Sequence, residues 1–271
     1  MRGGLPVRRS SADELPRLES KSRPGTRVAR KFFDDYPRFF TTSTTSASHS
    51  RLNLRYEAIF GENEEIFRGA RVLDIASHDG RWSLAALKSG ARSVTGIEAK
   101  PHLVENAKAN LAAYGIGESR YRFLSGDVFE VLASETFEVD VVLCLGFLYH
   151  TLRFNELMMR IRQLDPKYVI VDTEVLPGHR NKALILIHQE IVSREGNAVP
   201  DQFSHGDWVL SGKPNVRGLR KVMQAYDFQL EKFSDWGGLL RDNPTATHVK
   251  DYRAQERVTA LFRTCQNVIR S

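Results

Sequence analysis

Three acidic side chains follow three successive apolar segments in this chain of 271 residues. Asp74 lies in the run from Arg71 to Gly80, which reads as a buried strand that breaks into a tight turn and opens a helix. Glu98 ends a second apolar strand, and Asp127 follows a third. The carboxyl ends of parallel strands meet at one edge of a sheet, where a carboxylate can accept hydrogen bonds from ribose hydroxyls. The spacing therefore predicts one adenosine-containing ligand lying across that edge.

The turn between Asp74 and Gly80 argues against a dinucleotide site. A pyrophosphate needs a glycine-rich helix N-terminus, and Ala76 and His78 interrupt the G-x-G-x-x-G pattern. The remaining alternative is an ordinary strand-helix-strand unit whose strand ends carry acids by chance. We favour an adenosyl ligand over both alternatives.

Strands and helices alternate along the chain, which predicts a doubly wound α/β fold with a mostly parallel sheet. Gly90 and Gly115 end the first two crossover helices, and Pro101 suits the first turn of the second. The expected strands after Arg71 are 93–98, 121–125, 139–145, 168–172, 228–233 and 257–262, and the expected helices are 81–89, 101–114, 155–164 and 215–226.

This order of motifs resembles the class I S-adenosylmethionine-dependent methyltransferases. The resemblance implies a Rossmann-like sheet of seven strands with an antiparallel last strand, and S-adenosyl-L-methionine as the cofactor. It implies that the turn holds the methionine part, Glu98 the ribose, and Asp127 with Val128 the adenine. This family usually has glycine where the chain has Ala76 and His78, so the His78 side chain reaches space normally left to backbone. The resemblance also implies cofactor contacts from Asp74, Ala76, Ser77, His78 and Gly80 at the first strand and its turn, and from Cys144 and Gly146 at the end of strand 139–145.

A second signature, Leu145-Gly-Phe-Leu-Tyr-His150, follows strand 139–145. In the class I architecture this loop lies beside the transferring methyl group, so His150 is a candidate general base near neutral pH and Tyr149 a pocket-lining candidate. A structural His150 bonded to a backbone carbonyl is the alternative. The loop also resembles the tRNA wobble-uridine carboxymethyltransferase branch, whose large N-terminal portion has no counterpart of that length here.

Glu174 is the third candidate catalytic residue, because it follows the fifth strand at the same edge. Asp172, Glu174 and several histidines beyond them offer metal-ligand chemistry, but no two of them have a recognised ligand spacing. We therefore predict no metal site and interpret Glu174 as an acceptor-pocket residue. Cys144 and Cys265 form neither a disulfide framework nor a metal motif, and we interpret both as reduced thiols.

The flanking segments suggest three parts of the chain. Residues 1–27 are basic and poor in apolar side chains, which predicts a disordered tail. Residues 28–68 repeat aromatic and aliphatic side chains at helical spacing, which suits a lid or packing helix better than a base-stacking platform. Residues 69–271 form the methyltransferase domain, with a substrate-specificity insertion at about 176–214 that carries an extra strand.

Composition limits the function classes. The net charge of +6 admits a polyanionic partner without requiring one. No apolar run is long enough to span a bilayer and no signal peptide is visible, so we expect no membrane partner and a cytoplasmic location. The sequence thus predicts methyl transfer to an oxygen or nitrogen of a small molecule, such as a glycoside or secondary metabolite. A tRNA-modifying methyl- or carboxymethyltransferase, and a noncatalytic cofactor-binding regulator, remain the alternatives.

Overall fold

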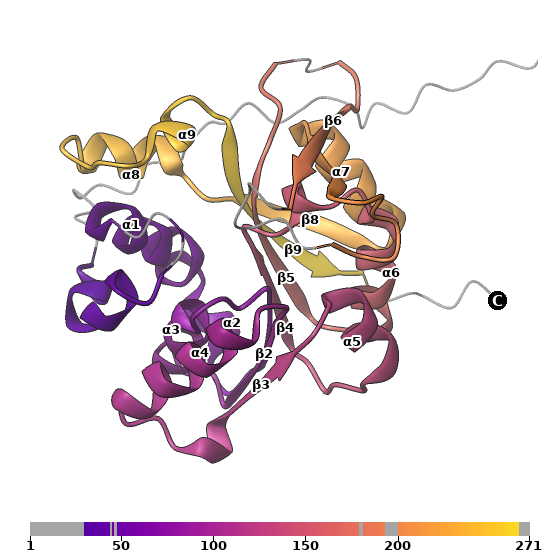
Figure 1. The fold of residues 1–271 in the computed structure, drawn as a ribbon. Helices are drawn as coiled ribbons and strands as arrows, with labels where there is room; N and C mark the ends of the chain where they lie inside the picture. The colour runs from indigo at the N-terminus through magenta and orange to yellow at the C-terminus, as the bar shows by residue number, and fades with distance from the viewer. Residues whose placement is uncertain (1–29, 44, 46–47, 179–180, 193–199, 266–271) are drawn as a thin grey trace, which may run out of the picture.

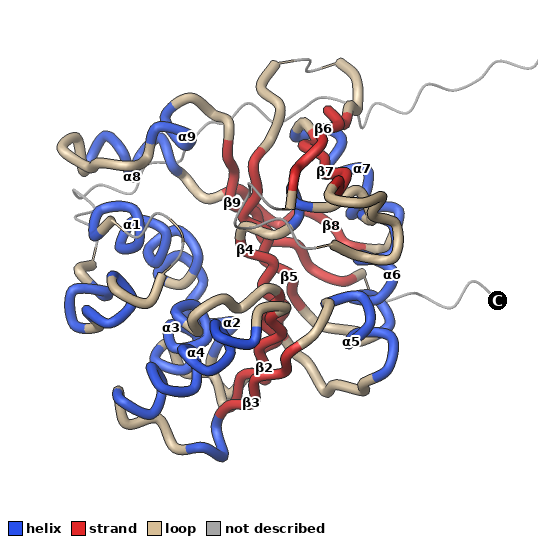
Figure 2. The backbone as a smooth tube through the Cα atoms, in the orientation of Figure 1, coloured by secondary structure: helices blue, strands red, loops and turns tan. Residues whose placement is uncertain are grey.

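A seven-stranded sheet runs through the centre of the protein, with helices on both faces (Figures 1 and 2). The computed structural model describes residues 30–43, 45, 48–178, 181–192 and 200–265, so the predicted tail lies outside the described residues. The strand order is β3-β2-β1-β4-β5-β9-β8, and β9 runs antiparallel to both of its neighbours. The predicted fold class is therefore confirmed. The strands are β1 (Arg71–Ile75), β2 (Ser93–Glu98), β3 (Tyr121–Ser125), β4 (Val141–Leu145), β5 (Tyr168–Glu174), β6 (Ile185–Ile191), β7 (Trp208–Pro214), β8 (Phe228–Phe233) and β9 (Arg257–Thr264).

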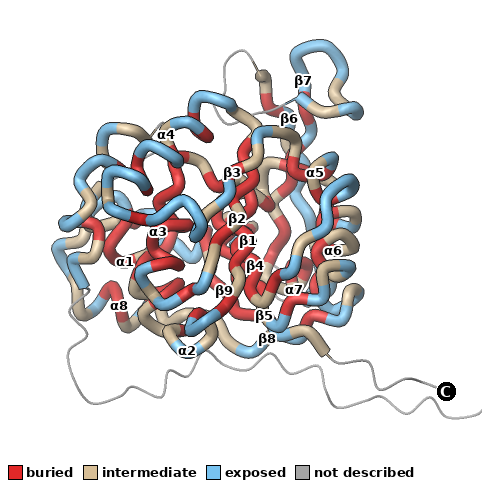
Figure 3. Tube along the Cα trace, turned by 90° about the horizontal axis from the view of Figure 1, so that it is seen from below, coloured by how far each residue is buried: buried red, intermediate tan, exposed pale blue. Residues whose placement is uncertain are grey.

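Alternate residues of the central strands supply two separate cores, because side chains of a strand point to opposite faces in turn. In β1, Val72 packs under the α3 and α4 layer, while Leu73 and Ile75 pack under the α5, α6 and α7 layer. Figure 3 shows buried residues along the strands and on the inward helix faces. With both faces covered, the strands are nearly continuous apolar runs. The α-helices are α1 (His49–Ile59), α2 (Glu64–Phe67), α3 (Arg81–Lys88), α4 (Pro101–Ala113), α5 (Val128–Ser134), α6 (Phe154–Gln163), α7 (Val216–Ala225), α8 (Trp236–Asp242) and α9 (Lys250–Arg253), and the 3₁₀ helices are η1 (Phe32–Asp35), η2 (Pro37–Phe40), η3 (Gly61–Asn63), η4 (Glu118–Arg120) and η5 (Leu148–His150).

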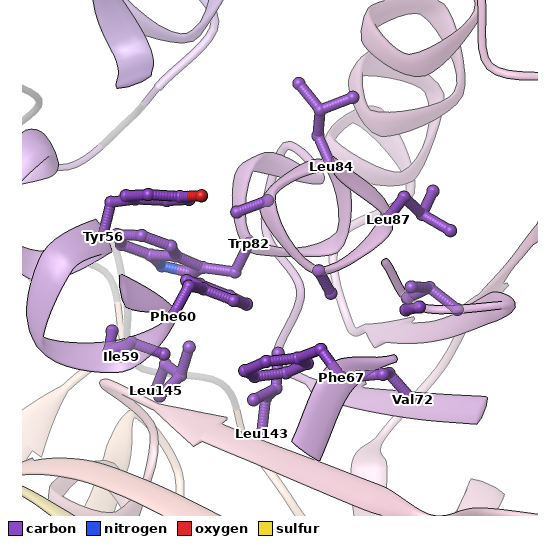
Figure 4. Close-up of a cluster of buried hydrophobic side chains, with 14 of the residues drawn as sticks. Tyr56, Ile59, Phe60, Phe67, Val72, Trp82, Leu84, Leu87, Leu143 and Leu145 are labelled. Carbon is purple, nitrogen blue, oxygen red and sulfur yellow. The ribbon is translucent and has the colours of Figure 1, made fainter. Parts of the chain in front are cut away.

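The aromatic segment before residue 41 forms two short 3₁₀ helices rather than one α-helix. Pro37 explains the break, because proline lacks an N–H and disfavours the α conformation in the residue before it; Tyr36 has φ −129° and ψ 60°. Phe33 and Phe39 are buried, and the Phe33 ring meets Trp82 edge-on at 5.3 Å between centroids. Figure 4 shows the adjoining cluster, in which Tyr56 of α1 and Phe60, the residue after α1, lie beside Trp82 of α3. These aromatic side chains are packing groups.

The region between β5 and α7 contains a β hairpin that stands apart from the main sheet. Strands β6 and β7 pair only with each other among the described residues. β7 packs against η5, the 3₁₀ turn that carries the Tyr149-His150 signature. This hairpin falls inside the stretch expected to carry substrate specificity. Within the described part of the chain, no helix is long and apolar enough to cross a membrane.

Candidate active site

A cavity of about 550 Å³ opens at the carboxyl ends of β1, β2 and β4. This volume lies within the range of small-molecule sites. One end is formed by the turn after β1 and by the ends of β2 and β3, and the other by η5, α1 and the segment from α9 to β9. Its lining includes eight of the predicted site residues, Ala76, His78, Glu98, Asp127, Val128, Gly146, Tyr149 and His150.

The turn after β1 keeps a left-handed backbone at both positions where glycine was expected. Ala76 has φ 54°, His78 has φ 53° and Gly80 has φ 79°. A non-glycine residue in this region costs roughly 1–2 kcal/mol. The His78 N–H donates a hydrogen bond of 2.9 Å to Oε2 of Glu98, which helps to hold the strained turn. Of this turn, Ala76 and His78 line the cavity.

Glu98 and Asp127 occupy the end of the cavity formed by β2 and β3. Glu98 is 7% exposed, and its Oε1 accepts a second hydrogen bond of 3.0 Å from the Lys100 N–H. Asp127 caps α5 through Oδ1, which accepts the Phe129 N–H at 2.8 Å and leaves Oδ2 for a ligand. Both acids are therefore fixed by backbone donors, an arrangement that suits hydrogen bonds to a nucleoside.

Four predicted cofactor residues, Asp74, Ser77, Gly80 and Cys144, are buried and do not line the cavity. Asp74 accepts a hydrogen bond of 2.7 Å from the Ser83 hydroxyl, and burial raises the pKa of its carboxyl to about 7. Burial also raises the pKa of the Cys144 thiol to about 12. Cys144 is free of any disulfide, as expected.

Tyr149 and His150 stand at the opposite end of the cavity. The Tyr149 hydroxyl accepts a hydrogen bond of 2.9 Å from Nη2 of Arg257. His150 Nδ1 lies 3.2 Å from Oε2 of Glu190, which belongs to β6. Neither Arg257 nor Glu190 was predicted as a site residue, because each lies far along the chain from the loop it contacts.

A buried carboxylate organises the wall behind Tyr149. Asp172 of β5 is fully buried and accepts hydrogen bonds of 3.0 Å from both Arg55 of α1 and Arg257 of β9. Tyr252 and Thr259 also donate to it, at 2.8 and 2.6 Å. Burial alone would raise the pKa of Asp172, but the two guanidinium groups hold it at about 2. The N-terminal helix α1 is thereby tied to the sheet beside the cavity.

Every arginine on this wall has a carboxylate partner. Arg51 is held by both oxygens of Asp251 at 2.7 Å, and Arg257 reaches Asp251, Asp172 and Glu174. Glu174 does not line the cavity; it lies 3.2 Å from Arg257 Nη2 and 2.5 Å from Lys213 Nζ. Charges on this wall therefore largely cancel, and Glu174 contacts Arg257 rather than the cavity. Among the residues that the structure describes, no three histidine, cysteine or acidic side chains are placed to hold a metal ion.

Comparison with known proteins finds a domain match and a shared fold. Residues 72–164 match a family model described as a methyltransferase domain. The fold resembles the N-terminal domain of EvdMO1 with S-adenosylhomocysteine bound (16% identity, 81% of this chain and 82% of that one, TM-score 0.53). It also resembles magnesium protoporphyrin IX methyltransferase from Synechocystis with S-adenosylmethionine bound (13% identity, 86% and 91% coverage, TM-score 0.53). Residues 72–164 are thus similar to a methyltransferase domain, and the sheet shares the fold of these S-adenosylmethionine-dependent methyltransferases.

A curated relative aligns with less than half of the chain. It is "Putative ribosomal RNA large subunit methyltransferase MJ1649" from Methanocaldococcus jannaschii, 29% identical over 133 residues. The alignment covers 44% of this chain and 34% of the relative, so the chain spans about a third of that protein's length. The comparisons do not show the likeness of the Tyr149-His150 loop to the wobble-uridine branch.

Proposed function

We propose that this protein transfers a methyl group from S-adenosyl-L-methionine to an oxygen or nitrogen of a small-molecule acceptor. The observation that carries the proposal is that one cavity is lined both by Glu98 and Asp127, the acids expected to bind a nucleoside, and by Tyr149 and His150. A cofactor held by the acids at one end would extend toward the phenol and imidazole at the other. An acceptor entering beside them would meet the methyl donor within the same space.

The cofactor end fits S-adenosylmethionine by its donor set. Glu98 would hold the ribose hydroxyls, and Asp127 with Val128 the adenine, while the turn from Ala76 to Gly80 would hold the methionine part. The bound cofactor supplies a methyl group activated by a positively charged sulfur. The protein then has to align the acceptor with that methyl group and remove the acceptor's proton.

The part of the cavity near Tyr149 and His150 offers a candidate base, and the charged side chains around it largely neutralise one another. His150 lines the cavity, and a neutral imidazole nitrogen can accept a proton from an acceptor hydroxyl or amine. Tyr149 is held by Arg257 and would orient the acceptor rather than exchange its proton. Because the arginines of this wall already pair with carboxylates, the cavity favours a neutral polar acceptor such as a glycoside or another secondary metabolite over a polyanion.

The test measures cofactor binding and methyl transfer separately. We expect calorimetry to show one S-adenosylhomocysteine site, and labelled S-adenosylmethionine to methylate components of a small-molecule extract with release of the demethylated cofactor. We expect His150→Ala to lower turnover by about 10²–10⁴-fold while leaving cofactor affinity unchanged. Full turnover in this variant would assign His150 a structural role. Cofactor binding without any demethylated product would favour a noncatalytic regulator.

An RNA acceptor is the second candidate, and the relative named as an RNA methyltransferase, together with the net charge of +6, favours testing it. A tRNA-modifying enzyme, whether it transfers methyl or carboxymethyl, should bind bulk tRNA with an affinity that falls steeply as salt rises. The small-molecule proposal expects no tRNA binding at low salt. Salt-sensitive tRNA binding accompanied by labelling of the RNA would replace it.

A further inference from the structure

We propose that Glu190, on the hairpin outside the main sheet, is a positioning residue that holds His150 as the base of the acceptor site. This inference rests on the proposed function, because it explains how His150 is prepared for proton removal. The structural basis is the close approach of β7 of the hairpin to η5. The hairpin would then take part in catalysis as well as in acceptor specificity.

The contact between the two side chains is direct and shielded. His150 Nδ1 lies 3.2 Å from Glu190 Oε2, and the side chains are only 19% and 12% exposed. Ser211 of β7, which is 1% exposed, supplies a second hydrogen bond to the same carboxylate. Burial would raise the pKa of Glu190, but the bonds from His150 and Ser211 lower it, so an ionised acceptor faces the imidazole.

The close approach of the hairpin to η5 requires a glycine in β7. A Cβ added at Gly212 of β7 would lie 2.6 Å from Cδ2 of Leu152 and 3.4 Å from Cζ of Phe154, in the segment just after His150. A larger residue would therefore push the hairpin away from η5. Glu190 contacts the imidazole at Nδ1, and His150 lines the cavity whereas Glu190 does not.

The pairing determines which imidazole nitrogen is available. An ionised carboxylate can only accept, so a neutral His150 must carry its proton on Nδ1 to bond with Glu190. Nε2 is then left with a lone pair to take the acceptor's proton. The imidazolium that results is stabilised by the same carboxylate, the role that a buried acid plays beside a catalytic histidine in acyl-transfer enzymes.

The first test uses nuclear magnetic resonance of histidine nitrogens in the full chain and needs no acceptor. We expect His150, assigned by the loss of its signals in His150→Ala, to show the tautomer with the proton on Nδ1. Glu190→Ala should shift it toward the other tautomer, whereas Gln189→Ala, an exposed neighbour on the same strand, should not. An unchanged His150 tautomer in Glu190→Ala would overturn the proposal even if the protein is an active methyltransferase.

The second test asks whether Glu190 acts through His150. We expect Glu190→Gln, which keeps the size of the side chain, to lower kcat about 10²-fold or more without changing the affinity for S-adenosylhomocysteine. In a His150→Ala background the same substitution should have no further effect, and Glu190→Asp should recover part of the turnover. Additive losses in the double variant would refute a shared role. Circular dichroism of each variant would separate these effects from a misfolded hairpin.

Discussion

Replacing Glu98 with glutamine tests the cofactor assignment most directly. Its two oxygens accept different backbone donors, Oε2 from the His78 N–H at 2.9 Å and Oε1 from the Lys100 N–H at 3.0 Å. An amide can present only one oxygen, so its NH₂ must face one of these N–H groups. The backbone N–H of either His78 or Lys100 therefore loses its hydrogen-bond acceptor. The ribose hydroxyls of a bound cofactor would also lose a charged acceptor.

The cost follows from the burial of this carboxylate. Losing the ribose's hydrogen bond to a charged acceptor costs about 1–3 kcal/mol, and leaving a buried backbone donor unpaired costs a similar amount. We expect Glu98→Gln to weaken S-adenosylhomocysteine binding by about that amount, which corresponds to roughly 5- to 150-fold in Kd. The mismatch with the backbone donors exists with and without ligand, so it should also lower the melting temperature of the free protein.

Isothermal titration calorimetry with S-adenosylhomocysteine measures this affinity without any knowledge of the acceptor. The matched control is Glu105→Gln, an exposed acid on α4 that pairs only with Lys108 among the described residues and should bind as the wild type does. A Glu98→Gln protein that is folded and binds with wild-type affinity would refute the ribose assignment.

Three further predictions concern stability. Ala76→Gly should stabilise the fold by up to about 1 kcal/mol because Ala76 has φ 54°, whereas Ala109→Gly inside α4 should destabilise it by about 0.5–1 kcal/mol in the same thermal denaturation experiment. Asp74→Asn should stabilise the protein at pH 8, because the pKa of Asp74 is about 7 in the folded protein against a reference of 3.8, so the wild type loses stability as pH rises from 4 to 7. Denaturant titrations should show the stability advantage of the variant shrinking toward pH 4. A stability advantage that does not change with pH would contradict the raised pKa of Asp74. Asp172→Asn should lower the free energy of unfolding by about 3–5 kcal/mol, because it leaves the buried guanidinium groups of Arg55 and Arg257 without this charge partner. The control Asp165→Asn, at an exposed acid, should change the free energy of unfolding by less than about 0.5 kcal/mol, and equal effects of the two substitutions would refute the role of Asp172.

The sequence by itself determined the sheet, its helices and the acids at its edge. Strand and helix patterns are local, since each element needs only its own apolar periodicity and its own turn residues. Glu98 and Asp127 could be found for the same reason, because Glu98 ends β2 and Asp127 comes two residues after β3. The Tyr149-His150 signature was visible because it directly follows β4.

Only the tertiary structure decided how the turn and the acceptor end are built. The left-handed backbone at Ala76 and His78 could not be predicted from their residue types, which normally avoid it. Arg257 contacts Asp172 across 85 positions of sequence, and Glu190 contacts His150 across 40. No periodicity encodes such pairs, because they form only when β9 inserts beside β5 and when the β6–β7 hairpin packs against η5.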